Sequence, residues 1–145
     1  MVPVTPGRRI LPTLLLGLVF LSGCCFGSDV PEDTSMHVST EFRDMHRCTR
    51  ISPEIVVANP PKGVALYSIR LDRVADDGAV RYLGGGAWKF DGKVDEEGLD
   101  YIPEGALTQN YRGPCEEGRY RLTVSALPNG SNRPLAVSSD TFRVK

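Results

Sequence analysis

The chain has 145 residues, which is enough for one domain with a modest hydrophobic core. Its 17 basic and 18 acidic residues almost cancel, so there is no basic excess to neutralise the phosphates of a nucleic acid. The charge balance therefore argues against a nucleic-acid-binding protein.

The first 23 residues have the pattern of an export signal. Arg8 and Arg9 give a positive start, and residues 10–20 (ILPTLLLGLVF) form a short apolar segment before Cys24. A cysteine in place of an Ala-x-Ala-like site predicts a bacterial lipoprotein, cleaved before Cys24, with diacylglycerol on the thiol and an acyl chain on the amine. The alternative is a transmembrane helix, but the apolar run is shorter than the roughly 20 residues that a helix needs to span a bilayer.

Residues 24–35 (CCFGSDVPEDTS) predict a flexible tether, because they combine Gly, Ser, Pro and acids without periodicity. Removing residues 1–23 takes away two basic residues and no acidic ones, which leaves 15 basic against 18 acidic, a net charge of −3. This balance gives no polybasic membrane patch, so the lipid would do the anchoring. The residue after Cys24 is Cys25 and not the aspartate associated with inner-membrane retention of bacterial lipoproteins, which favours the outer membrane, facing the periplasm.

From residue 36 onward the pattern is typical of short β-strands. We expect strands within 36–42, 54–58, 63–74, 119–127 and 136–144. The 119–127 segment alternates most clearly, with Tyr120 and Leu122 on one face and Arg119 and Arg121 on the other. Gly and Pro are spread between these segments, and none shows a helical apolar stripe. The sequence therefore predicts a single all-β domain over residues 36–145, a sandwich or a barrel.

Two cysteines remain for the folded domain. In an oxidising compartment Cys48 and Cys115 can form a disulfide, which would close a loop of about 68 residues and stabilise the fold by roughly 4 kcal/mol. A metal site with His46 is one alternative, but it supplies only three ligands. Two free thiols are the other. We expect the disulfide and no metal.

Catalytic motifs are absent from the sequence. His37 and His46 are the only histidines, and no G-x-S-x-G, H-E-x-x-H or phosphate-loop motif accompanies them. The acidic run at 95–97 lacks the spacing of a calcium loop. We therefore expect a non-enzymatic protein without a cofactor.

A series of short motifs follows one order along the chain. They are ISPEI at 51–55, NPPKG at 59–63, LD at 71–72, GGG at 84–86, IPEGAL at 102–107, YRGPC at 111–115, and GRY at 118–120 followed by LTVSAL at 122–127. The series resembles the phosphatidylethanolamine-binding, Raf-kinase-inhibitor-like family, and its bacterial members most of all. The resemblance covers about residues 36–144.

The resemblance implies a mainly antiparallel β-sandwich with a small pocket for phosphate-like head groups. Carried over to this chain, the pocket residues would be Asp72, Gly84, Gly85, Gly86, Gly113, Pro114 and Tyr120. Backbone N–H groups and side-chain donors suit phosphate oxygens, and glycine lets the backbone come close.

The chain departs from the family pattern in the pocket itself. Leu83 replaces the histidine before the glycines, Gly118 stands where a second histidine belongs, and Val74 replaces the second acid after the central strand. The expected function is therefore non-enzymatic binding of a small anion or phospholipid head group at a degenerate pocket. The alternative is a protein-interaction or inhibitor module of the periplasm that has lost its ligand, with an envelope protein as partner.

Each pocket residue also has an ordinary structural interpretation. Asp72 could belong to a turn at the strand end, Tyr120 to the core, and the glycine run to a tightly bent connection. Arg112 and Arg119 could supply positive charge in place of the histidines, although exposed arginines are usually only solvated.

Overall fold

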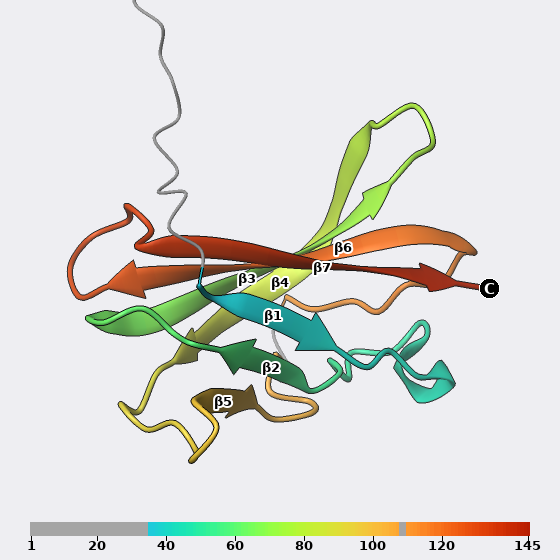
Figure 1. The fold of residues 1–145 in the computed structure, drawn as a ribbon. Coiled ribbons are helices and arrows are strands. Elements are labelled where there is room, and N and C mark those ends of the chain that lie inside the picture. Colours follow the sequence, from blue (N-terminus) through green and yellow to red (C-terminus); the bar gives the residue numbers. More distant parts are fainter. Residues whose placement is uncertain (1–34, 108–109) are drawn as a thin grey trace, which may run out of the picture.

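Seven β-strands in two antiparallel sheets form the described part of the chain in this computed structural model, residues 35–107 and 110–145 (Figure 1). This confirms the all-β prediction. The three-stranded sheet has the order β1-β2-β5, from β1 (His37–Thr40), β2 (Ile55–Ala58) and β5 (Leu99–Ile102). The four-stranded sheet has the order β4-β3-β6-β7, from β3 (Val64–Val74), β4 (Val80–Lys89), β6 (Gly118–Pro128) and β7 (Ala136–Val144). The predicted export signal, the lipid-bearing Cys24 and the tether as far as residue 34 lie outside the described residues.

The central strands β3 and β6 form because their apolar residues repeat every second position. Tyr67 and Ile69 of β3 are buried while Arg70 is exposed, and Leu122 and Val124 of β6 are buried between half-exposed neighbours. A turn follows β6, and Gly130 in it adopts a left-handed φ of 72°, which favours glycine. These two strands are therefore encoded by local sequence.

The core lies where the buried sides of the strands meet. Its most buried large side chains come from both sheets and from two residues outside the strands: Tyr67, Ile69, Leu71, Tyr120, Leu122 and Val124 from the four-stranded sheet, Ile55, Val57 and Ile102 from the three-stranded sheet, and Leu107 and Tyr111. At one edge the first and last strands meet, because the Thr40 N–H donates to Asp140 Oδ2 at 2.8 Å. Figure 1 shows β1 lying beside β7 at this edge.

Two features differ from the predicted strand pattern. The glycine run was expected at a connection, but it lies inside β4, which runs from Val80 to Lys89. Strand β5 was not predicted, because Leu99–Ile102 is only four residues long and its sequence, LDYI, is half polar. Both strands form through their pairing partners, β3 and β2.

Strand register fixes which side chains share a face of the four-stranded sheet. Asp72 pairs with Tyr82 and Arg121, whereas Tyr120 pairs with Arg73. Directly paired residues in antiparallel strands point to the same side, and adjacent residues point to opposite sides. We call the side that carries Asp72 the outer face, since the buried Leu71 and Leu122 occupy the other side.

A 3-10 helix, Asp44–His46, is the one helical element of the described residues. No helix within 35–107 and 110–145 is both long and apolar enough to cross a membrane.

Candidate functional site

Asp72 is a buried carboxylate on the outer face of the four-stranded sheet. Its side chain is only 2 % exposed. The Arg70 Nε donates to both carboxylate oxygens, at 2.7 and 2.9 Å, and Arg121 Nη2 lies 3.8 Å from Oδ2. Two guanidinium groups of the chain itself therefore neutralise Asp72, which the family resemblance placed in a ligand pocket.

Tyr120 lies on the opposite face of the same sheet. Its ring is buried in the core, and its hydroxyl donates to the Glu116 carbonyl oxygen at 2.6 Å. The structure thus separates Tyr120 from Asp72 by the thickness of the sheet, and the two do not share a pocket. The core interpretation of Tyr120 is the one that its burial supports.

The three glycines of β4 make room for another part of the chain. A Cβ at Gly84 would collide with the Asn110 carbonyl oxygen, and the Gly85 N–H donates to that same oxygen at 3.3 Å. A Cβ at Gly86 would come within 3.0 Å of the Leu107 side chain. The close approach of Leu107, Asn110 and Arg112 therefore explains Gly84 and Gly86 without a ligand, and the Ile69 carbonyl oxygen of β3 leaves no room for a Cβ at Gly85.

Gly113 and Pro114 hold the loop before β6 against the segment that contains the 3-10 helix. The Gly113 N–H donates to the Thr49 carbonyl at 2.8 Å, and the Cys48 N–H donates to the Pro114 carbonyl at 3.1 Å. A Cβ at Gly113 would overlap the His46 carbonyl oxygen. These contacts make Gly113 a packing position first.

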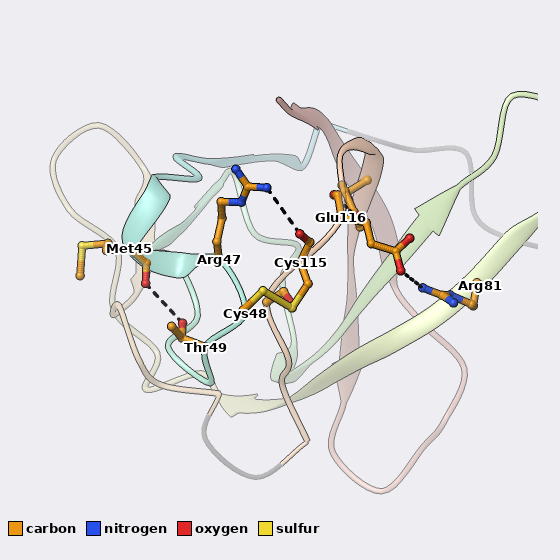
Figure 2. Close-up of a disulfide and its surroundings, with 9 residues drawn as sticks. Met45, Arg47, Cys48, Thr49, Arg81, Cys115 and Glu116 are labelled. Carbon is orange, nitrogen blue, oxygen red and sulfur yellow. Dashed lines mark hydrogen bonds and ion pairs between the residues drawn. A yellow bond between two sulfur atoms is a disulfide. The ribbon is translucent and has the colours of Figure 1, made fainter.

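The same two segments are joined through their cysteines. The sulfurs of Cys48 and Cys115 lie at disulfide distance, with Cα atoms 4.6 Å apart (Figure 2). Arg47 adds hydrogen bonds to the carbonyl oxygens of Cys115, at 3.4 Å, and Lys145, at 2.9 Å. We call this set of contacts between residues 46–49 and 113–115 the loop clamp.

His46, the third ligand of the alternative metal site, has both ring nitrogens engaged. Its Nδ1 accepts the Arg43 N–H at 2.9 Å and its Nε2 lies 2.9 Å from Glu104 Oε2, so the neutral ring carries its proton on Nε2. The hydrogen bond from His46 and the nearby Arg43 hold the pKa of the Glu104 carboxyl below its usual range. The ring is fully buried. Within 35–107 and 110–145, no three His, Cys, Asp or Glu residues are arranged to hold a metal ion.

A hollow of about 430 Å³ lies between β4 and the loop before β6. It is lined by Arg81, Tyr82, Leu83, Arg112, Gly113, Cys115, Glu116 and Tyr120. Two predicted pocket residues, Gly113 and Tyr120, therefore belong to it, while Asp72 and the three glycines do not. We call it the Arg81–Arg112 hollow.

The charges of the Arg81–Arg112 hollow come from two arginines and one acid. Arg81 is widely exposed and its Nη2 lies 3.9 Å from Glu116 Oε1 (Figure 2). Glu116 pairs more closely with Arg73. No hydrogen bond or ion pair to another described residue holds the Arg112 guanidinium. Two guanidinium groups can therefore turn toward an anion in the hollow.

A second hollow of about 540 Å³ adjoins the first at the end of β3 and β4. Its lining includes four arginines: Arg73, Arg81, Arg119 and Arg143. Of the arginines in the two hollows, the sequence pointed to Arg112 and Arg119. Arg73, Arg81 and Arg143 belong to none of the sequence motifs. They come close together only because β3 pairs with β4 and β6 pairs with β7.

No family model matches this chain, and neither does any curated protein or solved structure. The resemblance to the phosphatidylethanolamine-binding family therefore stands on the motifs alone.

Proposed function

We propose that this chain is a bacterial envelope lipoprotein, acylated at Cys24, whose β domain binds a small phosphate-bearing anion without enzymatic activity. The site is the Arg81–Arg112 hollow. One observation carries the proposal: Arg81 and Arg112 line the same hollow as Gly113 and Tyr120, the two residues where the family resemblance and the geometry coincide. We propose with it that the domain has the fold of this family, that the protein lies at the outer membrane, and that it needs no cofactor.

The arginines take over the task that histidines have in the family pattern. Guanidinium groups form charge-assisted, often bidentate hydrogen bonds with phosphate and carboxylate oxygens, and they stay charged at all physiological pH values. Loss of both histidines therefore need not remove anion binding. It should remove the pH dependence that imidazoles would give it.

A nuclear magnetic resonance titration of the purified, isotope-labelled chain tests the site. Inorganic phosphate and phosphoethanolamine serve as separate ligands, because the first measures phosphate recognition alone and the second adds the head group of a phospholipid. We expect saturable shifts at Arg81, Arg112, Gly113 and Tyr120. Arg81→Ala with Arg112→Ala should weaken binding at least about tenfold, since each loses charge-assisted hydrogen bonds.

The matched control removes two exposed arginines elsewhere. Arg50→Ala with Arg133→Ala changes the net charge equally and should bind like the wild type. Absence of shifts at millimolar ligand would reject the site. The acyl anchor has its own test, because Cys24→Ala should abolish labelling of the chain with palmitate.

The competing function is a protein-interaction or inhibitor module, and the β4 glycines favour it. The backbone at Asn110 occupies the space beside Gly84 and Gly85, so no ligand can be cradled there. If phosphate and phosphoethanolamine both fail to bind, this module becomes the better proposal, and capture of envelope proteins by the anchored chain becomes the next experiment.

A further inference from the structure

The outer face of the four-stranded sheet is strongly cationic. By strand register it carries five basic side chains: Arg70, Lys89, Arg119, Arg121 and Arg143. Asp72 is the one acidic residue in the same set of paired positions. At the start of β4 the same face exposes Tyr82 and Val80, which are 54 % and 45 % accessible.

The single acid offsets only one of the five positive charges and is itself hidden from solvent. Asp72 is 2 % exposed and lies beneath Arg70, whose side chain is 54 % exposed and stacks on the Tyr82 ring, with the guanidinium carbon 4.9 Å from the ring centroid. Arg121 is 40 % exposed. Solvent therefore meets guanidinium groups and not the carboxylate.

Two of the cations face each other directly. Arg119 of β6 pairs with Arg143 of β7, and like charges opposite one another in a sheet repel. Arg119 donates to the Ala75 carbonyl at 3.3 Å, which satisfies a donor but supplies no countercharge. Among the described residues, no acid forms an ion pair with either of them. An external anion would relieve this repulsion.

Besides apolar residues such as Leu66 and Val137, this face carries hydroxyl side chains, which favour an extended anionic partner over a single small ligand. Ser68, Thr123, Ser125, Ser139 and Thr141 lie among the cations by register, and the Thr123 and Ser139 hydroxyls are 3.3 Å apart. Hydroxyl and guanidinium donors are thus spread across the width of a sheet. Such an array matches many phosphates in a plane.

A bilayer is the anionic surface that the chain itself would keep within reach. Only ten residues, 25–34, separate Cys24 from the first described residue, Ser35. Even fully extended, they span less than about 40 Å. A domain held so close meets the bilayer at high effective concentration, where each surface arginine adds favourable attraction to anionic lipid.

We propose that the outer face of the four-stranded sheet docks on an anionic phospholipid surface through Arg70, Arg119, Arg121 and Arg143. The reach argument rests on the acyl anchor of the proposed function, whereas the charge of the face does not. The small-anion site is separate, because the Arg81–Arg112 hollow opens between β4 and the loop before β6.

Arginine footprinting on the full chain tests the proposal. The chain is mixed with excess vesicles of phosphatidylcholine alone, or of phosphatidylcholine with about one third phosphatidylglycerol, and phenylglyoxal modification is followed by mass spectrometry. We expect Arg119, Arg121 and Arg143 to react at least about fivefold more slowly on the anionic vesicles. Molar salt should remove this protection, and Arg50, exposed and outside the outer face, should react equally on both.

A pair of charge variants gives a second readout. Lys89→Gln, Arg119→Gln and Arg143→Gln together should abolish the remaining protection of Arg121, and they leave the Arg70–Asp72–Arg121 contacts in place. Arg50→Gln, Lys62→Gln and Lys93→Gln make the same change in net charge on exposed residues elsewhere and should leave it intact.

Three outcomes would overturn the proposal. Equal reaction rates on both vesicles would reject docking, even if phosphate still shifts the Arg81–Arg112 hollow. Protection that follows protein concentration and not lipid charge would assign the face to contact between copies of the chain. Equal protection in the two triple variants would mean that the outer face is not the contact.

Discussion

The two sheets of this domain share an apolar interior, but the segments that contain them and their connections carry opposite charges. Residues 35–58 and 90–107, which contain the three-stranded sheet and its connections, hold four basic and nine acidic residues, a net charge of −5. Residues 64–89 and 118–144, which contain the four-stranded sheet, hold eight basic and four acidic residues, a net charge of +4. A near-neutral total therefore hides a strong charge separation. The comparison teaches that net charge excludes a polyanionic partner only when the charges are evenly spread.

The sheets also differ in the surroundings of one carboxylate each, the buried Asp72 and the half-buried Asp100. Asp72 of the four-stranded sheet has two arginines beside it, whereas burial raises the pKa of Asp100 in β5. Among the described residues, Asp100 Oδ2 makes no hydrogen bond. Arginines therefore offset the charge of Asp72, whereas burial outweighs the hydrogen bonds that favour the ionised form of Asp100.

The loop clamp, which ties the connection after β1 to the loop before β6, gives the largest expected effect. Replacing Cys48 and Cys115 together by alanine should lower the free energy of unfolding by about 4 kcal/mol, because the unfolded chain regains the freedom of a loop that spans 67 positions. Urea unfolding of the two proteins measures the difference. Thiol alkylation without a reductant checks the pairing, and modification of both cysteines in the unfolded wild type would refute it.

Matched core truncations test whether the two inner faces are equivalent. Leu122→Ala in β6 and Ile55→Ala in β2 each remove a fully buried side chain, and each should cost about 3 kcal/mol. Ile51→Ala, at a position 41 % exposed, is the control and should change stability by less than about 1 kcal/mol. A cost for Ile55→Ala as small as that of the control would show that the three-stranded sheet unfolds independently of the core.

The carboxylates Asp72 and Asp100 give the smallest and most specific contrast. Asp72→Asn should lower stability at pH 7 by about 2 kcal/mol, because Arg70 and Arg121 lose their charged partner. Asp100→Asn should lower it much less or raise it, since burial penalises the ionised form of Asp100.

Unfolding curves between pH 4 and pH 7 separate the two carboxylates. A folded-state pKa above the unfolded value means that wild-type stability falls as Asp100 ionises with rising pH. The advantage of Asp100→Asn over the wild type should therefore grow from pH 4, near the usual aspartate pKa, to pH 7. A difference that is constant with pH would contradict the raised pKa.

Local alternation was enough to predict β3 and β6, because each has apolar residues at every second position in its centre, at 65–71 and 120–126. The segment of β7 was predicted as a strand that pairs with β6, although Ser138 and Asp140 interrupt its apolar positions. Local alternation could not predict β5, nor that the glycine run lies inside the strand β4. The LDYI of β5 and the GGG of β4 have no strand preference of their own and become strands through their neighbours.

The candidate site was predicted in part. Gly113 and Tyr120 line the Arg81–Arg112 hollow, but Asp72 lies on the opposite face. The alternation of side chains along a strand was enough to predict that Asp72 and Tyr120 lie on opposite faces. Asp72 directly follows the buried Leu71, whereas Tyr120 lies two positions before the buried Leu122. The arginines could not be found in this way, because their grouping depends on strand pairing across distant parts of the chain.

The position of β3 between β4 and β6 has a consequence for how the chain is made. Val64 pairs with Pro128, and Val74 pairs with Arg119, so the central pair of the sheet joins segments that are synthesised far apart. Such distant pairing makes folding slow, since the entropy of closing a long loop is lost before the contacts form. The four-stranded sheet cannot be completed until the last residues of β7 are available. A growing chain of this topology can form only the β3–β4 hairpin of the sheet before residues 118–128 have been synthesised.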